Sequence, residues 1–207
     1  MTARSRLAVI LLVALLPTAC ASESDQRASS PGGTAVESPS PSFATPTTAT
    51  ESTGSDAHVL VQAWTTAVLT DVTTGAMFRI ADLVASGKVV FLETMAIWCT
   101  NCRAQQEEAV VAFGALDPDR VVWIAIDIES SEPPAALASY REDHGFPFTY
   151  VVADADLARA LVDDFGDVVL SPPSVNVIVV GTDGRVTQLR GHKSASELRT
   201  LAAEHGA

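Results

Sequence analysis

Residues 89–102 read Val-Val-Phe-Leu-Glu-Thr-Met-Ala-Ile-Trp-Cys-Thr-Asn-Cys. The first half is mostly apolar and β-branched, which is typical of a buried strand. A helical pattern begins directly after Cys102, so Cys99 is predicted where a strand ends and a helix starts. Free backbone N–H groups and the positive end of the helix dipole favour an anion there, such as the nucleophilic thiolate of cysteine. Cys102 lies one helical turn away, within reach of a disulfide, so the stretch has the geometry that thiol–disulfide exchange requires.

The cysteine count isolates this pair. The chain has 3 cysteines, and Cys20 belongs to an N-terminal export segment, which leaves Cys99 and Cys102 as each other's partners. One alternative is an inert structural disulfide, but a bridge over two residues constrains the unfolded chain little. Another is a zinc site, but zinc needs four ligands and the 4 histidines lack the spacing of zinc ligands. We therefore expect a redox-active pair, with no metal and no cofactor.

Residues 1–20 are predicted to be a lipoprotein signal peptide. Arg4 and Arg6 form a basic start, and residues 7–16 form an apolar core too short to span a bilayer as a mature helix. Pro17-Thr18-Ala19-Cys20 then resembles a bacterial lipobox, whose cysteine is lipidated and becomes the new N-terminus. We expect an exported protein, anchored through Cys20 to the outer face of the cell membrane. The alternative is an ordinary secretory signal with an incidental cysteine.

The composition changes twice along the rest of the chain. Residues 21–56 are mainly Ser, Thr, Pro, Ala and Gly, which predicts a disordered tether. Residues 57–207 are predicted to form the folded domain. The chain carries a net charge of -12, with 13 Lys and Arg against 25 Asp and Glu, and this acidity argues against nucleic-acid binding.

Residues 90–102 resemble the active-site strand and turn of the thioredoxin superfamily. The most similar branch is the membrane-tethered group of extracytoplasmic thiol–disulfide oxidoreductases, the TlpA/ResA-like proteins. The resemblance implies an α/β thioredoxin-like fold, in which helices flank a central mixed β-sheet. It also implies an N-terminal hairpin before the active-site strand and an inserted strand and helix after the next core strand.

Local patterns predict the other elements. They are a hairpin around 73–75, a short helix over 81–86, a helix to about 116, a strand over 121–128, helices over 135–143 and 155–165, a turn at 182–184 and a last helix to about 204. The helix after Cys102 is predicted to bury Ala109, Val110, Phe113 and Leu116.

Four side chains around this turn carry the predicted chemistry. Cys99 is expected to be the exposed attacking thiol, and Cys102 the buried thiol that resolves the mixed disulfide. Glu93 lies in the apolar strand, where a carboxylate is costly without a task or a partner. The resemblance implies a proton shuttle, so our hypothesis is that Glu93 has a raised pKa and accepts the Cys102 proton. The alternative is that Glu93 lies on a solvated face of the strand and has no such role. Trp98 is expected to shape the docking surface.

Ser171-Pro172-Pro173-Ser174 is predicted to complete the site, because the resemblance places a cis-proline beside the two cysteines. Pro173 is the candidate, with the next strand starting at Ser174. Pro172 has no N–H to donate, so only its carbonyl can pair with a substrate peptide. Our hypothesis is that a cis Pro172–Pro173 bond aims that carbonyl at a partner strand and keeps metals off the thiols. The alternative is a trans loop.

The residues between the cysteines favour a reductant. Thr100-Asn101 contains no histidine to stabilise a thiolate, unlike the Pro-His of strong oxidants. We expect protein disulfides as substrates, and electrons from a membrane thiol transporter of the CcdA/DsbD type. By analogy to relatives, a role in cytochrome c maturation is expected. Two alternatives on the same fold are a thiol peroxidase, although Ala96-Ile97-Trp98 lacks the usual threonine, and a copper-handling lipoprotein.

Overall fold

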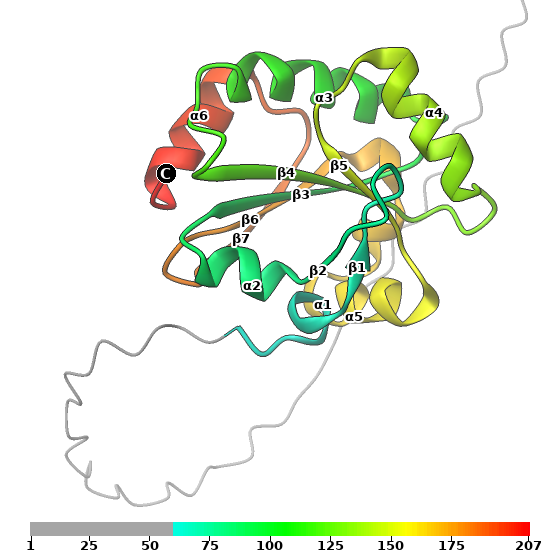
Figure 1. Ribbon diagram of the computed structural model, residues 1–207, viewed down its shortest axis with the longest axis horizontal. Coiled ribbons are helices and arrows are strands. Elements are labelled where there is room, and N and C mark those ends of the chain that lie inside the picture. Colours follow the sequence, from blue (N-terminus) through cyan, green and yellow to red (C-terminus); the bar gives the residue numbers. More distant parts are fainter. Residues whose placement is uncertain (1–59) are drawn as a thin grey trace, which may run out of the picture. The chain divides into compact units, whose positions relative to one another are not determined.

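The active-site strand β3 (Val89–Met95) lies in the centre of a five-stranded mixed sheet. The computed structural model describes residues 60–207, and the strand order is β5-β4-β3-β6-β7 (Figure 1). Strands β4 (Val121–Asp127) and β5 (Thr149–Val152) run parallel to β3. Strands β6 (Asn176–Val180) and β7 (Val186–Arg190) complete the sheet in antiparallel pairings. The predicted α/β architecture with a mixed sheet is confirmed.

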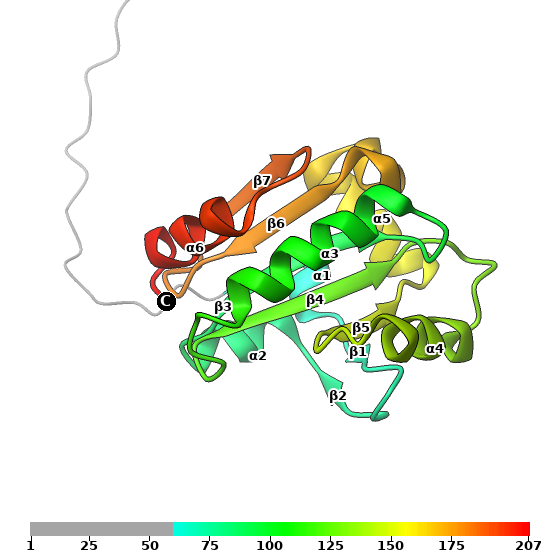
Figure 2. The same ribbon diagram turned by 90° about the horizontal axis from the view of Figure 1, so that it is seen from above.

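Helices cover both faces of the sheet (Figures 1 and 2). One face carries α3 (Thr100–Phe113), α4 (Pro134–His144) and α6 (Ala195–Glu204). The other face carries α1 (Ala63–Thr66), α2 (Ile80–Ala85) and α5 (Ala155–Phe165). Because β3 is covered on both faces, every residue of the strand is buried.

Alternation along β3 divides its side chains between two apolar cores. Val90 and Leu92 pack with the core beneath α1, α2 and α5. Phe91 and Met95 pack with the core beneath α3, where Phe91 stacks on Trp123 with ring centroids 5.9 Å apart. Glu93 has the parity of Phe91 and Met95, so it lies on the face covered by α3.

The predicted N-terminal hairpin is present, and two helices have well-defined caps. Strand β1 (Leu69–Thr70) pairs antiparallel with β2 (Met77–Phe78), and α2 follows. Helix α4 ends at Gly145, which adopts the left-handed conformation that glycine tolerates (φ 67°). Helix α6 begins with a capping box formed by Ser194 and Glu197.

The buried face of α3 differs from the prediction. Val110 is exposed, and the helix instead buries Cys102, Gln105, Gln106, Ala109 and Ala112. Two glutamines can be buried because both are paired, Gln105 with the backbone N–H and carbonyl of Lys193. The predicted positions Ala109, Phe113 and Leu116 do face this core, so Val110 is the wrong member, and the two buried glutamines are what the rule that buried positions are apolar missed.

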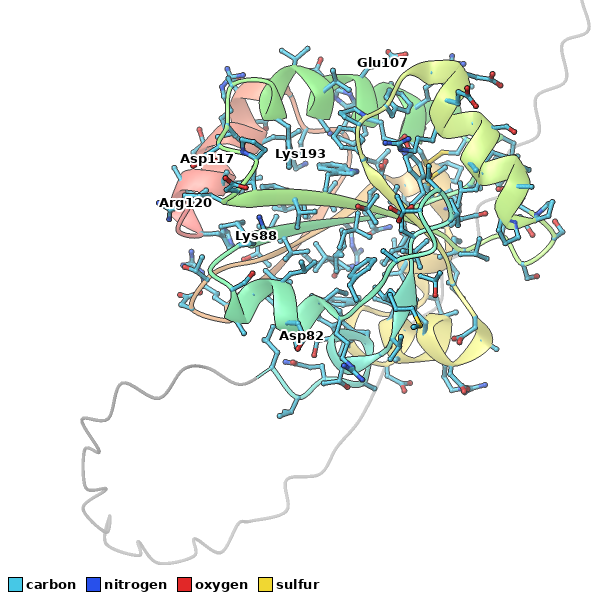
Figure 3. The ribbon with its side chains drawn as sticks, viewed as in Figure 1. Asp82, Lys88, Glu107, Asp117, Arg120 and Lys193 are labelled. Atoms are coloured by element: carbon cyan, nitrogen blue, oxygen red, sulfur yellow. A yellow bond between two sulfur atoms is a disulfide. The ribbon has the colours of Figure 1, made fainter. Side chains whose placement is uncertain are left out.

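Charged side chains gather at the end of the sheet where β3 and β4 begin. Lys88, Asp117 and Arg120 lie there together (Figure 3), and Lys88 Nζ donates to the carbonyl of Asp119 at 2.6 Å. The disulfide lies at the opposite end of β3. Within residues 60–207, none of the helices has the length and apolarity to cross a bilayer. Cys20 and the predicted signal and tether segments lie outside the described residues.

Candidate active site

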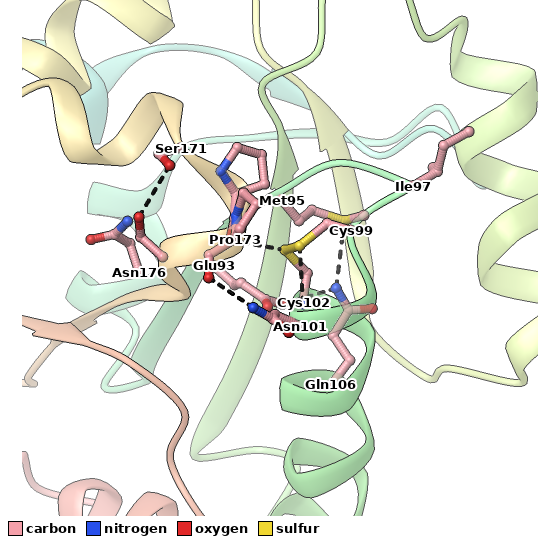
Figure 4. The surroundings of a disulfide bond; sticks show 12 residues. Glu93, Met95, Ile97, Cys99, Asn101, Cys102, Gln106, Ser171, Pro173 and Asn176 are labelled. Carbon is pink, nitrogen blue, oxygen red and sulfur yellow. Dashed lines mark hydrogen bonds between the residues drawn. A yellow bond between two sulfur atoms is a disulfide. The ribbon is translucent and has the colours of Figure 1, made fainter. Parts of the chain in front are cut away.

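Cys99 and Cys102 form a disulfide at the N-terminus of α3, directly after β3, with Cα atoms 5.3 Å apart (Figure 4). Cys99 is the N-cap residue, and its Sγ accepts a hydrogen bond from the backbone N–H of Cys102 at 3.1 Å. The same N–H and the helix dipole would stabilise a Cys99 thiolate after reduction.

Both sulfurs are covered in the oxidised protein. Cys99 is only 2% exposed and Cys102 is fully buried, so the expectation of an exposed Cys99 is wrong for this state. The disulfide holds Cys99 against the helix terminus. The backbone N–H of Cys99 also donates a hydrogen bond to the carbonyl of Ala96. The N-cap contact, rather than exposure, distinguishes Cys99 from Cys102.

The proline segment lies beside the disulfide but is not cis. Within residues 60–207 every peptide bond is trans, so the predicted cis Pro172–Pro173 bond is wrong. The two prolines instead open a 3-10 helix (Pro172–Ser174), because the fixed φ of proline suits the first turn of a helix. The chain then reverses through Val175 (φ 48°), and β6 begins at Asn176 rather than at Ser174.

The carbonyl of Pro172 points inward, which also overturns its predicted contact with a substrate strand. It accepts a hydrogen bond from Val175 N at 3.0 Å and lies 3.2 Å from Cys102 Sγ. A disulfide sulfur has no proton to donate, but the reduced Cys102 thiol can donate to this carbonyl. The segment therefore contacts the resolving cysteine rather than a partner.

Exposed side chains surround the buried disulfide. Trp98 is 56% exposed, and Asn101 and Pro173 are exposed as well. Asn101 Nδ2 donates to the Pro173 carbonyl at 3.0 Å, which ties the turn between the cysteines to the proline segment. Trp98 and Pro173, both predicted to bind substrate, are thus at the surface around the two cysteines.

Glu93 is completely buried beneath the disulfide (Figure 4). Its neighbours across the strands are Ala125 and Val177, which offer no polar group from their side chains. Gln106 Nε2 donates to Glu93 Oε2 at 2.9 Å, whereas Oε1 has no hydrogen-bond partner among residues 60–207. Burial raises the pKa of Glu93 to about 8, although the Gln106 amide and the nearby Trp123 indole oppose the rise. The solvated alternative for Glu93 is therefore excluded.

Two residues that the sequence did not single out complete this network. Tyr150 Oη donates to Gln106 Oε1 at 2.6 Å, and the Gln106 amide also lies 3.5 Å from the sulfur of Met95. The available signal was the spacing of Gln106, which follows Cys102 by one helical turn and so shares its face. Tyr150 lies in β5 and carried no comparable signal.

A second buried carboxyl lies behind the active-site turn. Asp127 ends β4, and burial together with the charges of Glu132 and Glu129 raises its pKa to about 7. Glu132 Oε2 accepts a hydrogen bond from Ile97 N at 2.9 Å, so the loop after β4 holds the turn that precedes Cys99.

A CxxC disulfide at the start of a helix, directly after the central strand of a mixed sheet, defines a thioredoxin-like fold. Solved structures agree. A thioredoxin-family thiol:disulfide interchange protein of Chlorobium tepidum has 21% identity and a TM-score of 0.53, with 68% of this chain and 93% of that chain covered. A secreted disulfide oxidoreductase of Mycobacterium tuberculosis has 20% identity and a TM-score of 0.51, and the match covers 70% of this chain and 99% of that chain.

The exposed lipoprotein thioredoxin of Streptococcus pneumoniae is a further similar structure. It has 17% identity and a TM-score of 0.52, and the match covers 67% of this chain and 98% of that chain. No protein-family model matches the sequence, and no curated protein matches it. At these identities the likeness establishes the fold, whereas the activity of this protein depends on the chemistry of the residues in its own site.

Proposed function

We propose that this protein is a membrane-tethered, extracytoplasmic thiol–disulfide oxidoreductase that reduces protein disulfides through Cys99 and Cys102. The observation that carries the proposal is the disulfide at the N-terminus of α3, together with the buried carboxyl of Glu93, which is hydrogen-bonded to Gln106 of the same helix. An inert bridge needs neither the N-cap contact to Cys99 nor a costly buried carboxyl beside it. The secreted and lipoprotein oxidoreductases with this fold support the extracytoplasmic location.

The proposed reaction starts from the reduced pair. The Cys99 thiolate attacks one sulfur of a substrate disulfide, forming a mixed disulfide, and the other substrate sulfur leaves as a thiolate that takes up a proton. The Cys102 thiol then gives its proton to the Glu93 carboxylate and attacks Cys99 Sγ. The second substrate thiolate leaves, and the disulfide seen in this structure forms. Two electrons pass from the cysteine pair to the substrate.

Each turnover leaves the protein oxidised, so a reductant must supply two electrons. We propose a membrane thiol transporter of the CcdA/DsbD type as donor, and a lipid on Cys20 as the anchor that holds the domain near it. Exposed Trp98 and Pro173 are proposed as the docking surface for both partners. An apocytochrome c is the proposed substrate, by analogy to the TlpA/ResA-like group.

The reduction potential of the Cys99–Cys102 pair tests the direction of electron flow. We expect a value near or below ~-250 mV, in the range of thioredoxin, because no histidine between the cysteines stabilises a thiolate. Equilibration of the purified protein in redox buffers, followed by thiol alkylation and mass spectrometry, measures it. The Cys99→Ser variant, which cannot form the pair, provides the baseline. A value near ~-120 mV would make the protein a disulfide donor.

The pH dependence of resolution tests the role of Glu93. Glu93 accepts a proton only as a carboxylate, and its pKa is about 8. The rate at which Cys102 resolves a mixed disulfide should therefore rise about tenfold per pH unit up to about pH 8 and then level off. Glu93→Gln should slow resolution on the order of 10²-fold at pH 8, and its rate should not level off near pH 8, because the Cys102 thiol then loses its proton only to solvent. Stopped-flow release of a chromogenic thiol from Cys99 measures the rate.

Asp127→Asn is the matched control, because Asp127 is a second buried carboxyl near the same turn. This variant should keep the rise in rate through pH 8. Loss of the levelling near pH 8 in Asp127→Asn, or its survival in Glu93→Gln, would assign the proton acceptor to another group.

A further inference from the structure

The Gln106 amide is surrounded by three polar groups that distinguish its oxygen from its nitrogen. Its Oε1 lies 2.6 Å from Tyr150 Oη. Its Nε2 lies 2.9 Å from Glu93 Oε2 and 3.5 Å from Met95 Sδ. All four residues are fully buried, so water does not compete for these contacts.

Two orientations of this amide have opposite effects on Glu93. With the NH2 group toward Glu93, the amide donates to a carboxylate and favours the ionised form. With the carbonyl toward Glu93, it can only accept a hydrogen bond, so it favours the protonated carboxyl. The group that selects the orientation therefore also sets the proton affinity of Glu93.

The hydroxyl of Tyr150 distinguishes the two orientations. Within residues 60–207, Gln106 Oε1 is the acceptor found for this buried hydroxyl. Rotating the amide would leave the hydroxyl proton without an acceptor and turn Oε1 toward the thioether sulfur of Met95. An unpaired buried donor is costly, so the hydroxyl holds the carbonyl on its own side.

We propose that Tyr150 is a positioning residue for the Glu93 carboxyl, because its hydroxyl fixes the Gln106 amide with the NH2 group toward Glu93. The Tyr150 hydroxyl bonds to Gln106 rather than to a cysteine, so in this proposal it acts through Gln106. This inference rests on the proposed role of Glu93 for its catalytic meaning, but the titration of Glu93 can be measured whether or not that role holds.

The chain provides a matched control in Tyr140. This tyrosine is also buried, and its ring lies 6.1 Å from that of Tyr150. Its hydroxyl has no hydrogen-bond partner among the described residues. Tyr140→Phe thus removes a buried hydroxyl from the same core without touching the Gln106 amide.

The experiment follows the Glu93 carboxyl by ¹³C NMR in the oxidised full-length chain, labelled at glutamate and kept in mild detergent. The Glu93 signal is the one that disappears in Glu93→Gln. We expect Tyr150→Phe to raise the titration midpoint of Glu93 by about one pH unit, since a hydrogen bond to a charged group is lost. Tyr140→Phe should leave the midpoint in place. An unchanged midpoint in Tyr150→Phe, or an equal rise in Tyr140→Phe, would overturn the proposal.

A double-mutant cycle separates positioning from a general loosening of the core. Gln106→Met removes the amide and should itself raise the midpoint. In the Gln106→Met background, adding Tyr150→Phe should produce no further shift, because the amide through which Tyr150 acts is absent. A further rise in the double variant would show that Tyr150 acts on Glu93 by another route. None of these midpoints depends on turnover, so the proposed function can fail without affecting this result.

Discussion

Replacement of Cys102 by serine is expected to convert the protein from a catalyst into a trap for its substrates. Cys99 keeps its N-cap position and can still attack a disulfide, but no second thiol remains to release the mixed disulfide. Turnover should fall by on the order of 10³-fold or more, as in other enzymes that lose a reacting group. Non-reducing electrophoresis should show covalent adducts that disappear with a reductant, and mass spectrometry identifies the trapped proteins.

Cys99→Ser is the control for this experiment. It removes the proposed attacking sulfur and should give neither turnover nor adducts, although Cys102 is present. Adducts formed through Cys102 in that variant would reverse the assigned roles, and full turnover in Cys102→Ser would exclude resolution by this cysteine. The proteins captured by Cys102→Ser would also identify the substrates, which the fold does not specify.

The buried carboxyl of Glu93 is also expected to make the free energy of unfolding depend strongly on pH. The pKa of Glu93 is about 8 in the folded protein and 4.5 without burial, so the folded state holds this proton more tightly than the unfolded state. Between those pH values the unfolded chain binds fewer protons, and the free energy of unfolding must fall as the pH rises. Below about pH 4.5 the contribution is fully present. By about pH 8 it is lost, a change of about 5 kcal/mol at most.

Glu93→Gln should remove this contribution, because glutamine does not titrate. We expect the variant to lose less stability than the wild type between pH 5 and pH 8, measured by urea unfolding at each pH. Asp127 also contributes a fall in stability, but one that ends near pH 7, so the interval from pH 7 to pH 8 isolates Glu93. Glu107→Gln, at an exposed position on α3, controls for the loss of one negative charge. If the free energy of unfolding of Glu93→Gln fell as steeply with pH as that of the wild type, Glu93 would not be the group with the raised pKa.

The two glutamates on either side of the disulfide illustrate what periodicity can and cannot reveal. Glu107 lies on the exposed face of a helix, where a charged side chain is ordinary. Glu93 lies in a strand that is apolar at almost every position, because it is covered on both faces. A two-residue period cannot assign a face to such a strand. The burial of Glu93 therefore follows from the helices that cover both faces of the sheet, and not from the sequence of β3.

The correction at the prolines has a related cause. The resemblance to thioredoxins correctly placed a proline segment beside the cysteines, since Pro172 O lies 3.2 Å from Cys102 Sγ. It also implied a cis bond before Pro173, and the structure has a trans bond there. Both prolines have the fixed φ that starts a helical turn, and the hydrogen bonds of Ser174 and Val175 close a 3-10 helix there.

Features that depend on neighbours along the chain follow from the amino-acid order alone. These are the strand that leads into the CxxC pair, the hairpin, the order of the helices and the cap formed by Ser194 and Glu197. Which groups meet across the sheet depends instead on how the folded chain packs. Tyr150 lies 44 residues from Gln106, yet its hydroxyl is the group that orients the amide facing Glu93. Local patterns contain no record of that contact, because it arises only when α3 packs on the face of the sheet to which Tyr150 of β5 contributes.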